Sequence, residues 1–446
     1  MKPNRILLLA CFFVSGLCGL IYQIVWMRLI GFVFGNSVYA TATVLAAFMG
    51  GLAVGSFFGG RVADRCTNRV RLYGILEIVI GVYCILLPLL LSLATPLYAA
   101  VYQHSEGTSG LLTIIRAVIC GALLILPTTC MGATLPILLR HFVEDGERLG
   151  RTVGLVYAVN TFGAVAGCVA AGFLLVPALG INKTIIIAVI LNLVVGIYAV
   201  AVGKAPDEYT PEEPESEDAR SEVAGLHYSG WEAKAALIVF GLSGFCAMVD
   251  EVALTRAFSL LVGSSTYAFT IMLTAFISGI GIGSLLLARK IDPRRDLLFG
   301  IALVQMGIGA CMLLAVILIS EFPKAMVHLI LRFQTSFGML QFTEFLYLFL
   351  LLLAPTALMG VMFPLTTAVW TRSVESVGKS SGEAYFVNTL GAIFGSLAAG
   401  FLLLPILGVQ LTLESAALLN FAAAGFVFFA SKRRKFIVRV EGGLAA

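Results

Sequence analysis

Ionisable residues are rare inside the long apolar segments of this sequence, and those that occur there are the first candidates for chemistry. The first apolar segment contains Arg28, and the seventh contains Asp250, Glu251 and Arg256. A charged side chain is costly within a bilayer, so such residues commonly mark substrate sites, proton relays or gates. Carboxylates here would attract a cation or a proton. The deep, adjacent positions of Asp250 and Glu251 favour a functional role.

The fourth and tenth apolar segments each contain one further ionisable residue, at matching positions of the repeat described below. These residues are Arg116 and Glu344. We expect Arg116 to pair with Glu344 or Glu251 as an outer gate, with Arg28 and Arg256 in the same gating group. The alternative is that these arginines and Glu344 lie near helix ends and extend to the lipid headgroups without touching a substrate.

Uncharged polar and aromatic residues near these charges complete the predicted binding site. Asn160 and Asn388 are the strongest of them, because a buried amide needs hydrogen-bond partners. Bonding between helices is the alternative to ligand contact and is favoured over it. A second group of carboxylates, Glu77, Glu383 and Glu414, lies within about two turns of helix ends, where we expect water to reach them. The predicted substrate-binding residues are Tyr22, Gln23, Trp26, Tyr157, Asn160, Asp250, Glu251, Tyr385 and Asn388.

The histidines and cysteines do not predict a metal or redox site. The four histidines have no metal-ligand spacing. The nine cysteines form no C-x-x-C pair and mostly lie in apolar runs, as small packing residues do. We therefore expect no metal, no cofactor and no enzymatic activity, and nothing in the sequence points to nucleic acid as a partner.

The elements that must position these residues are membrane-spanning helices. Hydrophobic residues make up 59% of the 446 residues and charged residues only 12%, and the mean hydropathy is +0.99. A soluble core could not bury this much apolar surface, so lipid must cover the rest. Stretches long enough to span a bilayer, about 20 residues each, occur near 6–30, 37–60, 72–98, 110–139, 152–176, 181–203, 235–258, 265–288, 297–320, 342–370, 380–404 and 409–430. The sequence predicts an all-α polytopic membrane protein with about twelve transmembrane helices.

The charges of the connecting loops predict the orientation in the membrane. Loops after the second and eighth stretches are basic, as is the short tail 431–446, whereas the alternate loops carry little charge. The positive-inside rule then places both termini in the cytoplasm. The segment 204–234 is rich in acidic residues, proline and serine, which is typical of a flexible linker.

The sequence repeats itself with a constant offset. Ser15 matches Ser243, Asn160 matches Asn388, and the motif P-T-x-x-M-G-x-x-x-P recurs at the same spacing of 228 residues. Six crossings per half is an even number, so the two halves enter the membrane from the same side. We expect two parallel six-helix halves, 1–203 and 235–430, in a major-facilitator-like arrangement.

The loop after the second stretch resembles a motif of the major facilitator superfamily, G-x-x-x-D-R-x-x-x-R. Here it reads Gly60-Arg61-Val62-Ala63-Asp64-Arg65 with Arg69 nearby, and Asp64 recurs as Asp292. The resemblance implies that Asp64, Arg65 and Asp292 help to close the cytoplasmic face.

Longer motifs give a more specific resemblance. The segments 15–28 (S-G-L-C-G-L-I-Y-Q-I-V-W-M-R), 46–56 and 157–167 (Y-A-V-N-T-F-G-A-V-A-G) resemble the membrane part of bacterial fused facilitator/spermidine-synthase proteins. The chain differs from that family in carrying Gln23 where relatives often have Glu. It also has no Gly-rich nucleotide-binding segment after the last stretch, so we expect no synthase domain and no synthase activity.

The resemblance and the carboxylates together predict a function. We expect a secondary transporter of the bacterial inner membrane that moves a polyamine or related amine by alternating access, with proton or ion coupling. One alternative is a transporter of an anionic metabolite bound by Arg28 and Arg116. A second alternative is a non-transporting scaffold that docks a soluble, aminopropyltransferase-like enzyme through its basic loops and acidic linker.

Overall fold

The computed structural model describes residues 4–34, 38–104, 109–144, 146–203, 228–261, 266–291, 295–333 and 336–431. These residues are almost entirely helical. The first six long helices are α1 (Arg5–Phe34), α2 (Val38–Arg65), α3 (Arg69–His104), α4 (Ser109–Phe142), α5 (Leu149–Val169) and α6 (Val176–Val202). The next six are α7 (Gly230–Leu261), α8 (Thr266–Leu286), α9 (Leu297–Phe333), α10 (Phe337–Trp370), α11 (Val377–Ala398) and α12 (Leu404–Ala430). Short 3-10 or π segments adjoin them: η1 (Gly146–Arg148), η2 (Ala170–Leu175), η4 (Ala288–Lys290), η5 (Val374–Ser376) and η6 (Ala399–Leu403).

Within the described residues, ten helical stretches are long and apolar enough to cross a membrane. Two of them, Leu149–Val202 and Val374–Ala430, contain 54 and 57 residues, about twice what one crossing requires. Each of these stretches is broken at a glycine with positive φ, Gly180 (φ 78°) and Gly408 (φ 72°). A side chain at such a position would be strained. The chain therefore changes direction where the sequence predicts the boundary between two crossings.

The helix boundaries follow the offset found in the sequence. The first residues of α2, α3, α4, α5 and α6 are 38, 69, 109, 149 and 176, and those of α8 to α12 are 266, 297, 337, 377 and 404, each 228 later. The predicted stretches coincide with these helices, although α3, α4, α9 and α10 extend beyond the predicted ranges. Hydropathy locates the apolar part of a helix and misses polar turns at its ends.

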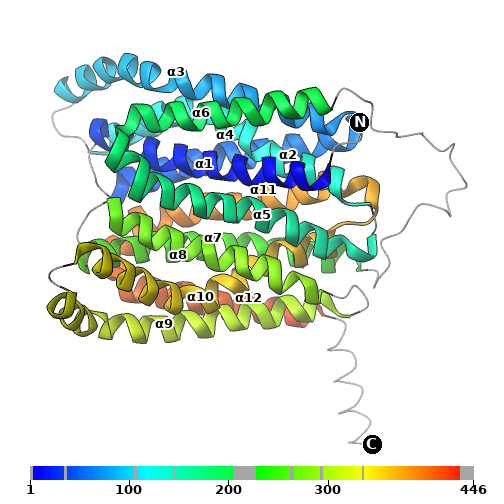
Figure 1. Cartoon of the computed structure of the whole chain (residues 1–446). Coiled ribbons are helices and arrows are strands. Elements are labelled where there is room, and N and C mark those ends of the chain that lie inside the picture. The colour runs from blue at the N-terminus through cyan, green and yellow to red at the C-terminus, as the bar shows by residue number, and fades with distance from the viewer. Residues whose placement is uncertain are drawn as a thin grey trace, which may run out of the picture.

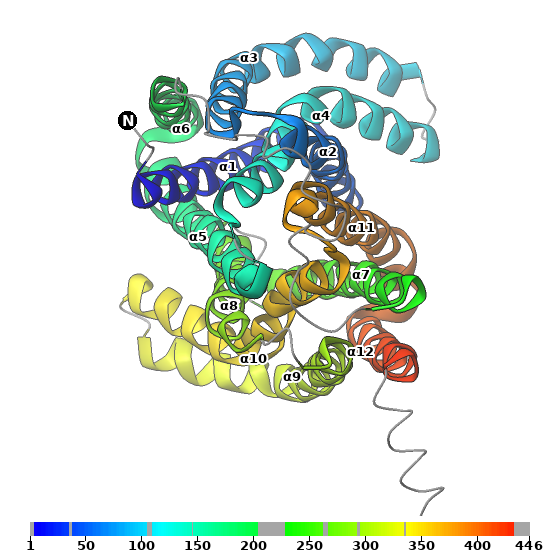
Figure 2. The ribbon, with the colours of Figure 1, turned by 90° about the vertical axis from the view of Figure 1, so that its right-hand side faces the viewer.

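Helices α1 to α6 lie mainly on one side of the molecule and α7 to α12 mainly on the other, with α5 and α11 where the two groups meet (Figure 1). Viewed along the helices, α11 lies beside α2 and α5 lies beside α8, and these two pairs make the most extensive contacts between the groups (Figure 2). Close backbone contact explains both pairs. A Cβ on Gly60 would stand 2.4 Å from the Gly378 carbonyl oxygen, and one on Gly154 would stand 2.7 Å from that of Ser284. Small residues allow helices to approach this closely within a membrane.

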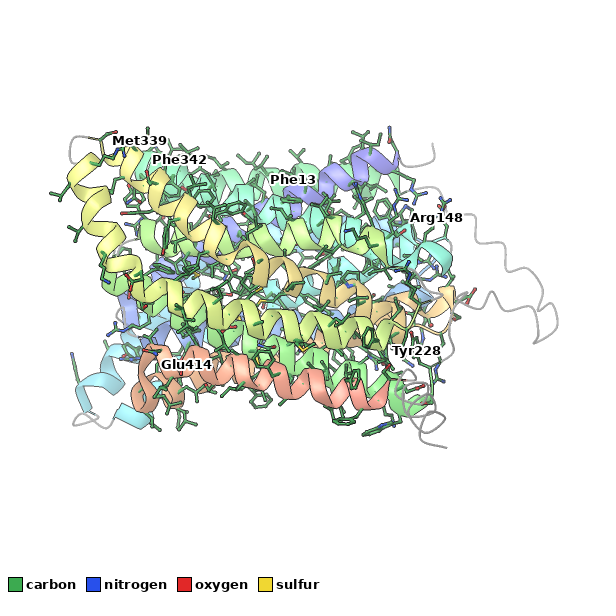
Figure 3. The ribbon with its side chains drawn as sticks, turned by 90° about the horizontal axis from the view of Figure 1, so that it is seen from below. Phe13, Arg148, Tyr228, Met339, Phe342 and Glu414 are labelled. Atoms are coloured by element: carbon green, nitrogen blue, oxygen red, sulfur yellow. The ribbon has the colours of Figure 1, made fainter. Side chains whose placement is uncertain are left out.

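The start of α1 and the end of α12 lie at the same end of the bundle, which we call the termini end (Figure 1). Arg148 and Tyr228 lie at this end, whereas Met339 and Glu414 lie at the opposite end (Figure 3). A hydrogen bond from Ser431 to Asp296 and an ion pair between Arg5 and Glu144 also belong to the termini end. Polar groups thus collect at the two ends of an apolar bundle.

Candidate functional site

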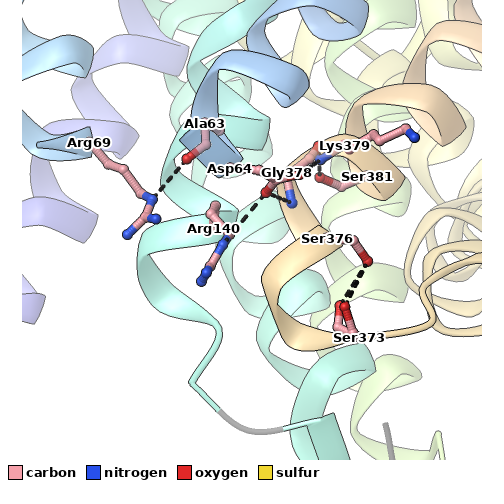
Figure 4. Close-up of polar contacts among 9 residues, drawn as sticks. All are labelled: Ala63, Asp64, Arg69, Arg140, Ser373, Ser376, Gly378, Lys379 and Ser381. Carbon is pink, nitrogen blue, oxygen red and sulfur yellow. Dashed lines mark hydrogen bonds and ion pairs between the residues drawn. The ribbon is translucent and has the colours of Figure 1, made fainter. Parts of the chain in front are cut away.

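Asp64 joins three helices at the termini end. Its carboxylate accepts hydrogen bonds from the backbone N–H groups of Gly378 (2.9 Å) and Lys379 (2.8 Å), in the first turn of α11 (Figure 4). A negative charge is stabilised there by the free N–H groups and the helix dipole. Arg140 at the end of α4 lies 3.5 Å from the same carboxylate. Asp64 therefore connects α2 and α4 to α11 on the other side of the molecule.

A second polar contact also joins α2 to α11. Arg61 of α2 donates to the Glu383 carboxylate of α11 at 2.8 Å, and the Trp370 indole N–H donates to the other oxygen at 3.0 Å. The Arg61 guanidinium also lies over the Phe57 ring, 3.5 Å from its centre, where a cation–π attraction operates. Glu383 is thus bound in an interhelical network, and its side chain is still 18% exposed.

The predicted loop residues differ in what they contact. Asp64 contacts the α11 N-terminus and Arg140, and its predicted role in closing the cytoplasmic face stays a prediction. Arg65 is exposed. Asp292 lies outside the described residues.

An aromatic cluster lies between the two groups of helices. Tyr157 of α5 and Tyr385 of α11, which are 228 residues apart, both contact Phe363 of α10, at ring distances of 5.1 and 6.0 Å. Phe240 of α7 stacks on Phe363, with the two ring centres 6.1 Å apart. The structure therefore brings both predicted tyrosines to one place, where they pack around an apolar ring.

The two adjacent carboxylates of α7 are buried. Asp250 is fully buried, and neither of its carboxylate oxygens has a hydrogen-bond partner among the described residues. Glu251 is 8% exposed and lies near Cys168 of α5. The Cys168 thiol accepts a hydrogen bond from Thr274 of α8 at 3.3 Å. Glu251 therefore lies where α7 approaches the α5–α8 pair, between the two groups of helices.

The residues of α1 that match these carboxylates are Tyr22 and Gln23, and both are buried. Tyr22 stacks on Trp26 with a ring distance of 5.4 Å, and Trp26 contacts Phe48 of α2 at 6.2 Å. The Tyr22 hydroxyl lies beside the Cys84 thiol of α3, whereas the buried Trp26 indole N–H has no partner among the described residues. An unpaired buried donor is costly, so the indole N–H is available to a ligand or to a rearranged neighbour.

The two predicted asparagines bind their neighbouring helices. Asn160 of α5 donates to the Phe12 carbonyl of α1 at 3.1 Å, and Asn388 of α11 donates to the Phe240 carbonyl of α7 at 2.9 Å. These are equivalent contacts in the two halves. The alternative of interhelical bonding thus describes the contacts that both side chains make.

The expected outer gate is not formed in this structure. The Arg116 guanidinium donates to the Tyr98 hydroxyl of α3 at 2.9 Å, within its own group of helices. Glu344 is 1% exposed and accepts a hydrogen bond from Gln341 at 2.8 Å. The pairing of Arg116 with Glu344 or Glu251 is therefore absent here, because nearer partners satisfy both side chains. Arg28 is partly buried and Arg256 is exposed.

Glu77 is a buried, hydrogen-bonded carboxylate that is absent from the predicted site residues. Glu77 of α3 is fully buried rather than accessible to water, and it accepts hydrogen bonds from Ser15 of α1 and Asn192 of α6, both at 2.5 Å. Its distance from the helix end is as expected, but α1 and α6 cover it. The 228-residue comparison offered a signal, since Glu77 matches Gln305 while Ser15 and Asn192 match residues of their own types.

Comparison with known proteins gives a family and a fold. The sequence profile of the Major Facilitator Superfamily matches residues 6–343. Among curated proteins, the polyamine aminopropyltransferases of Mycobacterium tuberculosis and Oceanobacillus iheyensis are 27% identical over 195 residues and 25% identical over 207 residues. The matches cover 42% and 46% of this chain but only 34% and 37% of those proteins. The chain therefore spans about a third of the length of these curated relatives.

Solved transporter structures share the arrangement of helices. A bacterial homologue of the iron transporter ferroportin in an outward-facing state has a TM-score of 0.57 at 12% identity, covering 95% of this chain and 97% of that one. The fucose:proton symporter of E. coli has a TM-score of 0.53 at 12% identity, covering 94% and 98%. The human organic anion transporter MFSD10 has a TM-score of 0.55 at 11% identity, covering 96% and 100%. At these identities the likeness shows the fold alone, but the superfamily profile matches more than half of the sequence, and the chain therefore belongs to the Major Facilitator Superfamily.

Proposed function

We propose that this protein is a secondary transporter that moves a small amine, most simply a polyamine, across the bacterial inner membrane by alternating access. Twelve crossings form two parallel six-helix halves, with the breaks at Gly180 and Gly408 separating crossings five from six and eleven from twelve. The termini end faces the cytoplasm, as the basic loops predict. The two halves rock about a site between them, and the Asp64 contacts to α11 hold the cytoplasmic side closed.

The observation that carries the choice of a cation is the environment of Glu251. This carboxylate is 8% exposed, it lies between the helix groups, and no cationic side chain pairs with it within the described residues. Its neighbour Asp250 also has no hydrogen-bond partner in the part of the chain that the structure describes. A buried carboxylate without a counter-charge is strongly unfavourable. A protonated amine bound between the halves would supply that charge, and its carbon chain would suit aromatic walls such as Trp26 and Tyr157.

The curated relatives point to the same class of substrate. The matched proteins are named as polyamine aminopropyltransferases, and only about a third of their length corresponds to this chain. A membrane part that accompanies polyamine chemistry would handle a polyamine substrate or product. Arg116, which would favour an anionic substrate, is bound to Tyr98 within one half.

Transport by purified protein in liposomes tests this proposal. We expect uptake of labelled putrescine or spermidine by the wild type, and a loss of about tenfold or more in the Glu251→Gln variant, because the amide cannot supply the charge. Asp250→Asn tests the adjacent carboxylate in the same way. Glu321→Gln is the matched control, because this carboxylate is exposed and pairs only with Lys324 among the described residues.

Two results would contradict the proposal. Unchanged rates in both the Glu251 and Asp250 variants would remove these carboxylates from the mechanism. Absence of flux of any solute, together with stable co-purification of a soluble enzyme, would favour the docking scaffold.

A further inference from the structure

Glu77 lies in a polar site enclosed within one half of the molecule. Its two carboxylate oxygens accept separate hydrogen bonds, one from the Ser15 hydroxyl and one from the Asn192 amide. Tyr73, one turn earlier on α3, is also fully buried, and its hydroxyl lies within reach of Ser15 and Glu77. The side-chain oxygen of Asn192 is buried and has no hydrogen-bond partner among the described residues. The site therefore contains a further hydroxyl donor and a spare amide oxygen next to the carboxyl group.

These partners can satisfy Glu77 in either protonation state. An ionised carboxylate only accepts hydrogen bonds, and Ser15, the Asn192 amide and the Tyr73 hydroxyl all offer donors. A neutral carboxylic acid must donate one hydrogen bond, and rotation of the Asn192 amide by half a turn would present its spare oxygen as the acceptor. A purely structural carboxylate needs only one of these arrangements.

The surroundings of Glu77 contain no opposing charge. Among the described residues, no lysine or arginine forms an ion pair with it. The titratable groups that face it from the packed helices are all neutral at ordinary pH: Cys11, Cys18 and Tyr22 on α1, Tyr73 and Cys84 on α3, and Cys130 on α4. The helix α6 contributes Asn192. A proton is therefore the simplest means by which the site can neutralise its own charge.

The other half of the molecule has the same framework but no carboxylate at the equivalent position. Gln305 replaces Glu77, and it is fully buried with neither side-chain amide atom hydrogen-bonded among the described residues. Ser243 and Asn420 occupy the positions that match Ser15 and Asn192. On α3 the residues Arg69, Tyr73 and Glu77 follow at intervals of four, so they share one helix face that leads toward the termini end. The equivalent face of α9 carries Leu297, Ile301 and Gln305. The fold thus tolerates apolar and uncharged residues at all three positions.

We propose that Glu77, with Ser15, Asn192 and Tyr73, forms a proton-binding site in the N-terminal half, and that its occupancy is coupled to transport. The proton adds to one carboxylate oxygen and returns to water when it is released. Gln305 cannot bind a proton in this range of pH, so one half of the duplicated fold carries the coupling site. The coupling part of this proposal rests on the transport activity proposed above, whereas the proton binding does not.

Infrared difference spectroscopy of the protein in lipid nanodiscs tests the proton binding without a substrate. We expect the C=O stretching band of a protonated carboxyl group to be larger at about pH 5 than at about pH 9, and Glu77→Gln to remove part of this pH-dependent band. Gln305 shows that glutamine is accepted in the equivalent environment, so this variant should fold. Glu414→Gln, at a carboxyl group bonded to Gln410 at the opposite end, is the matched control and should leave that part unchanged.

A band that is unchanged in Glu77→Gln would overturn the proposal, because Glu77 would then be ionised throughout. A band removed by the substitution but independent of pH would also overturn it, because Glu77 would then be a permanently neutral structural group. If sodium rather than acid neutralised the site, seen as a sodium-dependent loss of the band at constant pH, a metal cation would replace the proton.

Transport measurements then test the coupling. In Glu77→Gln we expect exchange of labelled for unlabelled substrate within about twofold of the wild type, but a fall of about tenfold or more in accumulation driven by a pH gradient. Equal accumulation by both proteins would overturn the coupling. If the wild type transported nothing, the transport function would fail, and the infrared result would still decide whether Glu77 binds a proton.

Discussion

The two groups of helices, α1 to α6 and α7 to α12, share a framework, and a buried polar site is one of the places where they differ. In the N-terminal half, Ser15 and Asn192 both bond to Glu77. In the C-terminal half, Ser243 and Asn420 are present, but Gln305 bonds to neither of them. Positions that are the same in both halves, such as Asn160 and Asn388, make the same contacts between helices. The position that differs here, Glu77 against Gln305, is the one that the proton-binding hypothesis concerns.

Packing contacts illustrate the shared part of this comparison. A Cβ on Gly163 would stand 1.9 Å from the Phe13 carbonyl oxygen, and one on Gly391 would stand 1.9 Å from that of Gly241. These two contacts join α1 to α5 and α7 to α11. Identical distances at matching positions show that each half uses the same close approach between its first and fifth helices.

The largest effect should come from breaking this shared packing. Gly163→Ala and Gly391→Ala each place a methyl group inside a backbone contact, and we expect each to cost about 3 kcal/mol of folding free energy. Thermal unfolding in detergent measures the loss. Gly121→Ala is the control, because a Cβ there would meet no atom within 4 Å. A large loss in one half and none in the other would show that the halves do not share this framework.

A smaller effect is expected when Gln305 is replaced by glutamate, the residue found at the matching position in the N-terminal half. Gln305→Glu places a carboxyl group beside Ser243 and Asn420 but without a tyrosine equivalent to Tyr73, since Ile301 stands there. We expect a loss of about 2 kcal/mol near neutral pH, because the buried site disfavours the ionised group. The unfolded state binds fewer protons than the folded state as pH rises, so the loss should grow with pH.

Unfolding of this variant at about pH 5 and about pH 8 measures the dependence. An unchanged stability at both values would mean that the C-terminal site accepts a carboxylate as readily as the N-terminal site does. The contrast between the two halves would then carry no functional information.

Much of the fold could be predicted from the sequence, because hydropathy and the repeat are properties of the whole chain. The twelve apolar stretches coincide with α1 to α12, and the predicted interruptions near 177–180 and 405–408 contain the glycines at which the long helices break. The ends of α3 and α9 were missed because their last turns lie outside the apolar window. Asp292 and residues 204–227 of the predicted linker lie outside the described residues and stay predictions. The end of the linker was placed too late, because residues 230–234 belong to α7.

The candidate site was predicted less well, because contacts depend on side-chain direction as well as on depth. Arg116 and Glu344 lie at matching positions, yet nearby Tyr98 and Gln341 bind them. Glu77 lies at the expected depth, but its direction toward α1 and α6 buries it completely. Sequence spacing gives the depth of a residue in a membrane and leaves open which neighbour covers it.

The smallest effect should separate packing from substrate contact at the two asparagines. Each donates one hydrogen bond to a carbonyl group of its neighbouring helix, Asn160 at 3.1 Å and Asn388 at 2.9 Å. Bonds of this kind between membrane helices contribute about 0.6 kcal/mol on average. Asn160→Ala and Asn388→Ala should therefore each lower the free energy of unfolding by about that amount.

Thermal unfolding and transport measured on the same samples distinguish the two roles. Because the carbonyl partners belong to the scaffold, we expect similar small losses of stability and transport rates within about twofold of the wild type. A tenfold loss of transport at unchanged stability in either variant would instead make that asparagine a substrate ligand.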